Sequence, residues 1–244
     1  MKPVAKSRLD HLLVARGLTE TGGKARALIM AGSVLVDGTK MDKPGHGVAA
    51  GARIEILEGP RFASRGGQKL EAALDRFSID VTGRVCLDIG ASTGGFTDCL
   101  VQRGARRVYA VDVGKGQLDW KLRNHPRVVP REGLNARYLK FEDIGERAGL
   151  AVCDVSFISV TLILPALPPL VEPEGEMVVL VKPQFEVGRG QVARGGIVRD
   201  PALHAAACAR VTSAAQALGF QTAIMESPIR GTEGNKEFLL YAHH

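Results

Sequence analysis

The chain has 244 residues and a formal charge of +6 at pH 7, enough for one large domain or for a small domain and a medium-sized one. The basic balance favours an anionic partner, either nucleic acid or a membrane surface. No apolar run approaches the roughly 20 residues that span a bilayer, and no secretory signal is visible. Four scattered cysteines without metal or disulfide spacing predict free thiols in a metal-free, cytoplasmic protein.

The N-terminal part has the pattern of a compact α+β module. Leucines on one face predict a helix that starts near Ser7, and a second helix is predicted over residues 23–31. Alternating apolar residues predict strands over 33–38, which ends in an Asp-Gly turn, and over 53–57. Two helices and a small β unit of this size indicate a separate domain.

A break in the pattern divides the chain. Gly59 and Pro60 stop the preceding strand, and both residue types interrupt regular structure. We therefore predict one domain over residues 1–59, an interdomain linker over 60–64 and a second domain over 65–244.

Strands and helices alternate through the second part, which predicts a doubly wound α/β sheet. An unbroken apolar run such as 177–181 is typical of a strand buried on both faces of a parallel sheet. The predicted strands cover residues 85–89, 108–112, 128–129, 150–157, 177–183, 220–226 and 238–242, and the predicted helices cover 70–77, 97–103, 162–170 and 201–218.

A glycine-rich loop follows the first of these strands. Glycines let the backbone approach a ligand closely, and the helix that follows favours a negatively charged group. The loop lacks the lysine of a phosphate-binding loop, and Ser92 stands where a dinucleotide loop has its second glycine. S-adenosylmethionine suits it better, although an ordinary βα turn stays an alternative. The candidate donor-binding residues are Asp88, Gly90, Ala91, Ser92, Thr93, Gly94, Gly95 and Phe96.

Polar residues close several of the predicted strands. Asp112 follows Gly90 by 22 positions, a spacing at which a carboxylate can accept hydrogen bonds from a ribose. Asp88, Asp154 and Lys182 also close strands, so all four side chains should share one rim of the sheet. Lys182 is a candidate base, but a strand-end lysine that reaches into solvent is an equally simple explanation.

The N-terminal module resembles the S4-like RNA-binding domain. The resemblance implies that Arg8, Lys24 and Arg26 face structured RNA and contact mainly its backbone and shape. Taken singly, each could equally be a solvated surface charge. The residues that carry the resemblance are Arg8-Leu9-Asp10, Leu18-Thr19, Lys24-Ala25, Leu28-Ile29, Gly32, Val34, Val36 and Gly38.

Five motifs in order resemble the TlyA, or hemolysin A-like, family of ribosomal RNA methyltransferases, whose catalytic domain is similar to the FtsJ type. They are Ser64-Arg65-Gly66-Gly67-Gln68-Lys69-Leu70, the stretch Asp88–Thr97, Asp154-Val155-Ser156-Phe157-Ile158-Ser159, Lys182-Pro183-Gln184-Phe185-Glu186 and Gly234-Asn235-Lys236-Glu237-Phe238. The resemblance implies a Rossmann-like class I methyltransferase sheet behind the small α+β domain. It also implies 2′-O-ribose methylation of cytidine in ribosomal RNA, in ribosomal subunits, with S-adenosyl-L-methionine as donor.

The same resemblance assigns a catalytic tetrad of Lys69, Asp154, Lys182 and Glu237. We expect Lys182 to take the proton of the 2′-hydroxyl and Lys69 to orient that hydroxyl. Asp154 and Glu237 would hold the two ammonium groups in place. Three further arginines, Arg65, Arg189 and Arg194, are candidate RNA contacts, the last two in a glycine- and arginine-rich loop.

Two other functions remain open at this stage. The hemolysin name raises a membrane-active protein, although no spanning segment supports it. The second alternative is a non-catalytic RNA-binding protein with a degenerate pocket, against which the intact tetrad argues. The sequence leaves the oligomeric state and the target nucleotide unknown.

Overall fold

The computed structural model describes residues 6–57, 59–193, 195–231 and 233–244. The chain separates into two compact units between Arg61 and Phe62, within the segment that the sequence marks as a linker. Phe62 is 3% exposed and belongs to the core of the second unit. Each unit is described by itself below.

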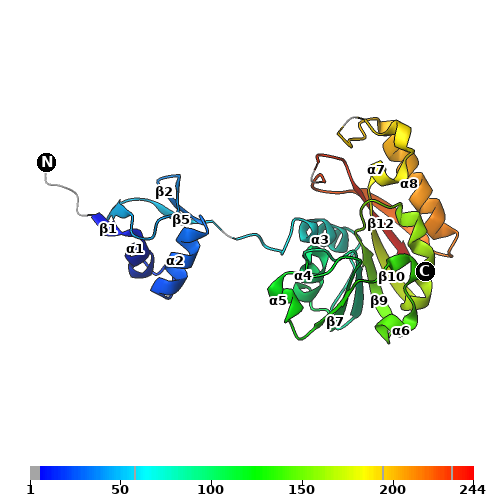
Figure 1. Cartoon of the computed structure of the whole chain (residues 1–244), viewed down its shortest axis with the longest axis horizontal. Coiled ribbons are helices and arrows are strands. Elements are labelled where there is room, and N and C mark those ends of the chain that lie inside the picture. Colours follow the sequence, from blue (N-terminus) through cyan, green and yellow to red (C-terminus); the bar gives the residue numbers. More distant parts are fainter. Residues whose placement is uncertain (1–5, 58, 194, 232) are drawn as a thin grey trace. The chain divides into compact units, whose positions relative to one another are not determined.

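The first unit packs two helices against short antiparallel strands (Figure 1). Its core consists mainly of apolar side chains from the helices and from β2, among them Leu9, Leu13 and Ile29. Strand β1 pairs with β4, and β2 lies between β3 and β5. The elements are β1 (Lys6–Arg8), α1 (Leu9–Ala15), α2 (Gly22–Met30), β2 (Val34–Val36), β3 (Thr39–Met41), β4 (Gly47–Ala49) and β5 (Ile54–Ile56).

Local signals explain most of these boundaries. Thr21 caps α2, because its hydroxyl accepts a hydrogen bond from the backbone N–H of Lys24 at 3.2 Å. Asp37 and Gly38 both have positive φ and form the predicted turn between β2 and β3. The predicted first helix is confirmed as α1, but it begins at Leu9 rather than at Ser7, because Ser7 lies in β1 and pairs with Val48.

The second unit is built on a seven-stranded sheet in the order β11-β12-β10-β9-β6-β7-β8. Strands β10, β9, β6, β7 and β8 run parallel, whereas β12 is antiparallel to both of its neighbours. This confirms the predicted Rossmann-like α/β sheet, which follows a small α+β unit in the sequence. The strands are β6 (Val85–Ile89), β7 (Arg107–Asp112), β8 (Val128–Glu132), β9 (Ala148–Cys153), β10 (Val171–Val181), β11 (Gln221–Glu226) and β12 (Phe238–His243).

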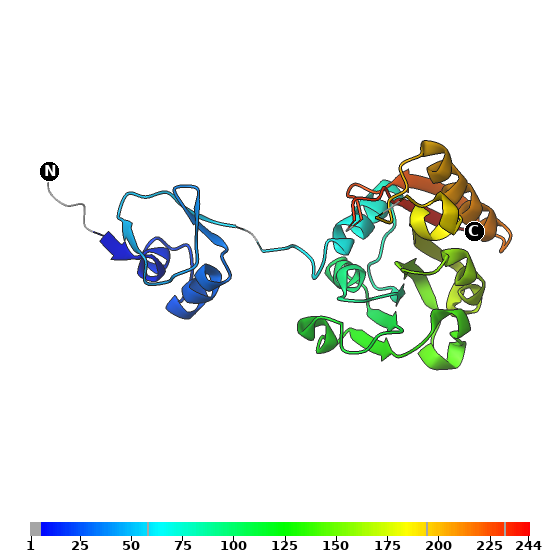
Figure 2. The same ribbon diagram turned by 45° about the horizontal axis from the view of Figure 1, so that its top comes forward.

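Helices cover both faces of this sheet, with α3 and α4 on one side and α8 on the other (Figures 1 and 2). Alternate residues of the central strands enter the two cores: Val178 packs on the α3 side and Val179 on the α8 side. The helices are α3 (Gly66–Arg76), α4 (Gly95–Gln102), α5 (Trp120–Arg123), α6 (Phe141–Ile144), α7 (Pro183–Glu186) and α8 (Pro201–Gln216).

Two departures from the predicted elements shape the site. Helix α3 begins at Gly66 rather than at residue 70, so Lys69 stands in its first turn. The predicted helix over 162–170 is instead three short 3-10 turns, because its prolines lack the N–H that an α-helix needs.

Candidate active site

The glycine-rich loop lies against the end of the neighbouring strand β9. Gly90 has φ +83°, and a methyl group there would overlap the backbone carbonyl of Asp154. Gly94 has φ +97°, and a methyl group there would overlap the side chain of Leu122. Only glycine satisfies both the backbone angle and the close approach. The loop therefore exposes backbone atoms, without side chains at these two positions, at the edge of the sheet.

Asp88 supports this loop from behind. It is completely buried, and its Oδ2 accepts a hydrogen bond from the Thr97 hydroxyl at 2.6 Å. Its Oδ1 has no hydrogen-bond partner among the described residues, and burial raises the pKa of the Asp88 carboxyl to about 7. The sequence placed Asp88 among the residues that touch a donor, but its carboxyl does not face the cavity.

Asp112 lies where the sequence predicted it, at the end of β7 and at the edge of the loop. Its Oδ2 accepts from the backbone N–H of Ser92 at 2.8 Å and its Oδ1 from that of Gly114 at 2.7 Å. The carboxylate lines a cavity of about 430 Å³, with Leu134 and Asn135 on another wall. Carboxylate oxygens have lone pairs left for further donors, such as ribose hydroxyls.

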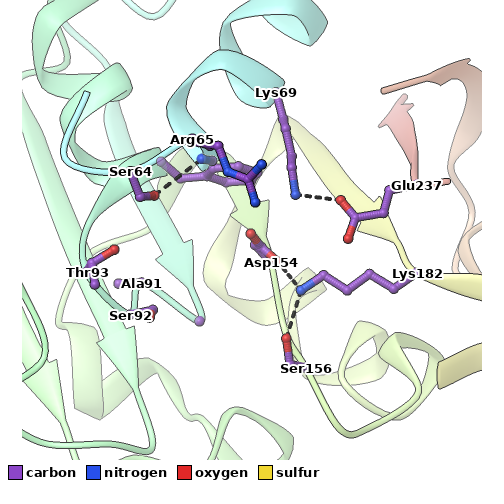
Figure 3. Close-up of a pocket in the computed structure, with 14 residues that line it drawn as sticks. Ser64, Arg65, Lys69, Ala91, Ser92, Thr93, Asp154, Ser156, Lys182 and Glu237 are labelled. Carbon is purple, nitrogen blue, oxygen red and sulfur yellow. Dashed lines mark hydrogen bonds and ion pairs between the residues drawn. The ribbon is translucent and has the colours of Figure 1, made fainter. Parts of the chain in front are cut away.

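The four tetrad residues come together as two ion pairs (Figure 3). Lys69 Nζ lies 2.5 Å from Glu237 Oε2, and both side chains are buried. Lys182 Nζ lies 2.5 Å from Asp154 Oδ1 and donates a hydrogen bond to the Ser156 hydroxyl at 2.8 Å. The Lys182–Asp154 contact is an ion pair that is not aligned as a hydrogen bond, because the buried Asp154 Oδ1 accepts no hydrogen bond from the described residues.

Three of the tetrad residues flank a strand or helix, and the fourth, Lys69, lies in the first turn of a helix. Lys69 is in α3, Asp154 follows β9, Lys182 precedes α7 and Glu237 precedes β12. All four line a cavity of about 240 Å³ together with six residues of the glycine-rich loop: Gly90, Ala91, Ser92, Thr93, Gly95 and Phe96. This cavity and the one beside Asp112 share Gly90, Ser92, Asp154 and Ser156. The two adjoining cavities therefore offer a polar half and a more apolar half.

The structure adds residues that motif spacing did not single out. Ser156 contacts the Lys182 ammonium, and Phe157 is 92% exposed with φ +67°. The Phe157 ring lies 5.5 Å from that of Phe185, beside a third cavity of about 400 Å³ that also reaches Lys182. Strained backbone and an exposed aromatic ring are typical of functional sites, but neither is readable from a sequence pattern.

The RNA candidates of the first unit lie on its surface. Arg8 forms a two-pronged ion pair with Asp10, at 3.0 and 2.9 Å, and keeps about half of its side chain exposed. Lys24 pairs loosely with Glu20 at 3.4 Å, and Arg26 is exposed. All three remain accessible to a partner.

Of the candidates in the second unit, Arg65 is exposed and lines the tetrad cavity. Arg189 begins a short 3-10 helix, Arg189–Gln191, and Arg194 lies outside the described residues. Among the described residues no cluster of His, Cys, Asp and Glu could hold a metal ion. In that part of the chain, no helix has the length and apolar character to cross a membrane.

Comparisons with known proteins agree with this architecture. Residues 62–244 match the FtsJ-like methyltransferase family, and residues 7–54 match the S4 domain. Fold and matches together define a class I methyltransferase unit joined to an S4 domain. The chain belongs to the FtsJ-like methyltransferase family, which confirms the resemblance drawn from its motifs.

Relatives match almost the whole chain. It is 48% identical over 239 residues to the 16S/23S rRNA (cytidine-2'-O)-methyltransferase TlyA of Mycobacterium tuberculosis, covering 97% of this chain and 89% of the relative. It is 43% identical over 236 residues to Hemolysin A of Brachyspira hyodysenteriae, covering 96% and 98%.

Solved structures are similar as well. A protein from Streptococcus thermophilus that is named as a hemolysin superposes with a TM-score of 0.74 at 45% identity, covering 98% of this chain and 89% of that chain. A protein from Listeria monocytogenes that is named as an S-adenosylmethionine-dependent methyltransferase has a TM-score of 0.55 at 14% identity, covering 74% and 99%. The second likeness concerns the fold alone.

Proposed function

We propose that this protein transfers a methyl group from S-adenosyl-L-methionine to the 2′-hydroxyl of a cytidine in ribosomal RNA. The observation that carries the proposal is the pair of ammonium groups, Lys69 and Lys182, each held by a carboxylate in the cavity that the glycine-rich loop lines. The relatives named above support the choice of acceptor.

The donor fits the two adjoining cavities. The more apolar one, beside Asp112, Leu134 and Asn135, would take the adenosine, with the Asp112 carboxylate as acceptor for ribose hydroxyls. The polar one would take the methionine end against the bare backbone of the glycine-rich loop. The donor supplies a methyl group on a positively charged sulfur, which is a good leaving group.

The residues of the chain then have to align and deprotonate the acceptor. Lys182, after release of one proton to solvent, accepts the proton of the 2′-hydroxyl as that oxygen forms its bond to the methyl carbon. The bond between this carbon and sulfur breaks with its electrons left on sulfur. Asp154 and Ser156 hold the resulting ammonium, while Lys69, fixed by Glu237, directs the hydroxyl.

Both units would contact the acceptor RNA. We assign residues 1–59 to RNA binding through Arg8, Lys24 and Arg26, and residues 65–244 to chemistry, with residues 60–64 as linker. Arg65 would contact the RNA near the tetrad, and we keep Arg189 and Arg194 as further candidate RNA contacts. With ribosomal RNA as the substrate, the protein would act in the cytoplasm and in contact with ribosomal subunits.

Mapping of ribose methylation tests the proposal directly. Ribosomal RNA from cells that lack the protein should lose 2′-O-methylcytidine, and the purified protein with donor should restore it. Lys182→Ala should bind the donor yet restore nothing. Unchanged methylation in the deletion strain would overturn the proposal. Release of dye from liposomes by both wild type and Lys182→Ala would instead favour membrane activity, which the name of one relative raises.

A further inference from the structure

A fourth cavity, of about 370 Å³, lies in the second unit between the segment before α8 and the segment before β12. Three of its lining residues carry a formal charge, and all three are cations: Arg199, Arg230 and Lys236. This differs from the tetrad cavity, in which each lysine faces a carboxylate. The cavity is therefore a positively charged region whose lining residues include no carboxylate.

The cations come from two loops that one side chain fastens together. Asn235 is 1% exposed, its Oδ1 accepts from the backbone N–H of Val198 at 2.9 Å, and its Nδ2 donates to the carbonyl of Gly196 at 2.8 Å. These buried hydrogen bonds fix the position of the loop of Arg199 relative to the loop of Arg230. The backbone segments that carry the three cations are thus held close to one another before any ligand binds.

The charges of this cavity are available to a ligand. Arg199 is exposed and forms no ion pair within the described residues. Arg230 is also exposed, and its one hydrogen bond to a described residue is a long one, 3.3 Å, to the carbonyl of Gly234. Lys236 contacts Glu226 at 3.1 Å, in a pair whose side chains are 39% and 54% exposed, so solvent weakens the attraction.

The acidic residue next to Arg199 in sequence is already engaged. Asp200 caps α8, because its Oδ1 accepts from the backbone N–H of Ala202 at 2.8 Å. His204, one turn into α8, points its Nε2 at the carbonyl of Val198 at 2.9 Å. Neither side chain neutralises the arginines, and both stabilise the loop that carries Arg199.

We propose that Arg199, Arg230 and Lys236 form a binding site for a backbone phosphate of the acceptor RNA strand. Two guanidinium groups and an ammonium suit a phosphodiester, since guanidinium can bind its oxygens in a bidentate manner. Lys236 directly precedes Glu237, so the segment that holds the phosphate also carries a carboxylate of the tetrad. The site would fix the position of the RNA strand relative to the reacting hydroxyl. This inference rests on the proposed function.

The test compares RNA affinity among single and double variants of the full chain. Arg199→Ala and Arg230→Ala remove lining charges, and Arg147→Ala is the matched control. Arg147 is exposed and precedes β9, at the opposite rim of the parallel strands from the tetrad. Purified, unmethylated ribosomal subunits serve as the ligand, without donor, at several salt concentrations.

Each cavity variant should weaken RNA binding about tenfold, and the double variant Arg199→Ala with Arg230→Ala should reduce the magnitude of the slope of log affinity against log salt by roughly one. Arg147→Ala should bind like the wild type. Arg199→Lys should recover most of the affinity, whereas Arg199→Gln should not, which separates charge from packing. Donor affinity by calorimetry should stay within twofold throughout.

Equal RNA affinity in Arg199→Ala and Arg147→Ala would overturn the phosphate site. A loss in Arg199→Ala that Arg199→Lys fails to recover would also overturn it, because packing would then explain the effect. The binding readout needs no methyl transfer. If the wild type transferred no methyl group while these affinity differences persisted, the site would stand and only the proposed reaction would fall.

Discussion

The ammonium of Lys69 and the carboxylate of Glu237 lie 2.5 Å apart although 168 positions separate them in the chain. Both side chains are nearly inaccessible to water, at 10% and 3% exposure. A buried charge without its partner is costly, while a buried pair is close to neutral in its net effect on stability. This pair therefore links the folding of the unit to the reaction that we propose.

Glu237→Gln should lower both stability and activity. The amide leaves the Lys69 charge without a counter-charge, which should lower the free energy of unfolding by roughly 3 kcal/mol, measured by urea denaturation. Removing both charges, in Lys69→Met with Glu237→Leu, should regain most of this stability but no activity. A Glu237→Gln variant as stable as the wild type would contradict the buried pair.

Lys182 distinguishes proton removal from simple positive charge. Lys182→Ala should lower kcat by roughly 10²–10⁴-fold, the usual contribution of a general base. Lys182→Arg should be equally inactive, because guanidinium keeps its proton. Calorimetry with the donor should give unchanged affinity for both. Substantial turnover in Lys182→Arg would show that the position needs only a cation.

Gly90 can be tested against a second glycine with the same backbone angle. Gly90 and Gly145 have φ +83° and +86°, but only at Gly90 would a methyl group meet another atom, the carbonyl of Asp154. Both alanine variants should lose about 1–2 kcal/mol of stability through backbone strain, and Gly90→Ala should lose more, because of the overlap with the Asp154 carbonyl. Only Gly90→Ala should lose donor binding, by more than tenfold in calorimetry. Equal donor affinity in both variants would remove the loop from the donor site.

Asp88→Asn should change the pH dependence of stability. Burial raises the pKa of the Asp88 carboxyl from 3.8 to about 7, so the folded protein holds a proton that the unfolded chain releases. The wild type therefore loses stability as pH rises from about 4 to about 7, and the loss is complete above that range. Asp88→Asn cannot ionise and avoids this loss. Its melting temperature relative to the wild type should rise between pH 5 and 8; a constant difference would argue against the raised pKa.

Sequence patterns were most informative where a strand ends. The apolar run at 177–181 identified a strand buried on both faces, and this placed Lys182 at the rim with Asp112 and Asp154. Because parallel strands end at one edge, strand assignment alone brings distant residues close. The pairing of lysines with carboxylates came from the family motifs and could not have come from spacing.

The sequence was least informative about the direction of side chains. Asp88 closes a strand as Asp112 does, yet Asp88 is completely buried whereas Asp112 lines a cavity. Likewise nothing in the chain indicates that Phe157 is exposed, because its positive φ depends on how the segment after β9 turns. Such features follow from tertiary packing, which local patterns do not encode.

The place of β12 in the sheet has a consequence for biosynthesis. This strand lies between β10 and β11, and Glu237 directly precedes it. The tetrad is therefore incomplete until the last strand has inserted between two strands made earlier. A nascent or truncated chain that ends before Glu237 could fold the donor loop, but it could not assemble the reaction centre. Methyl transfer would then require a completely folded chain, and incomplete copies would methylate no RNA.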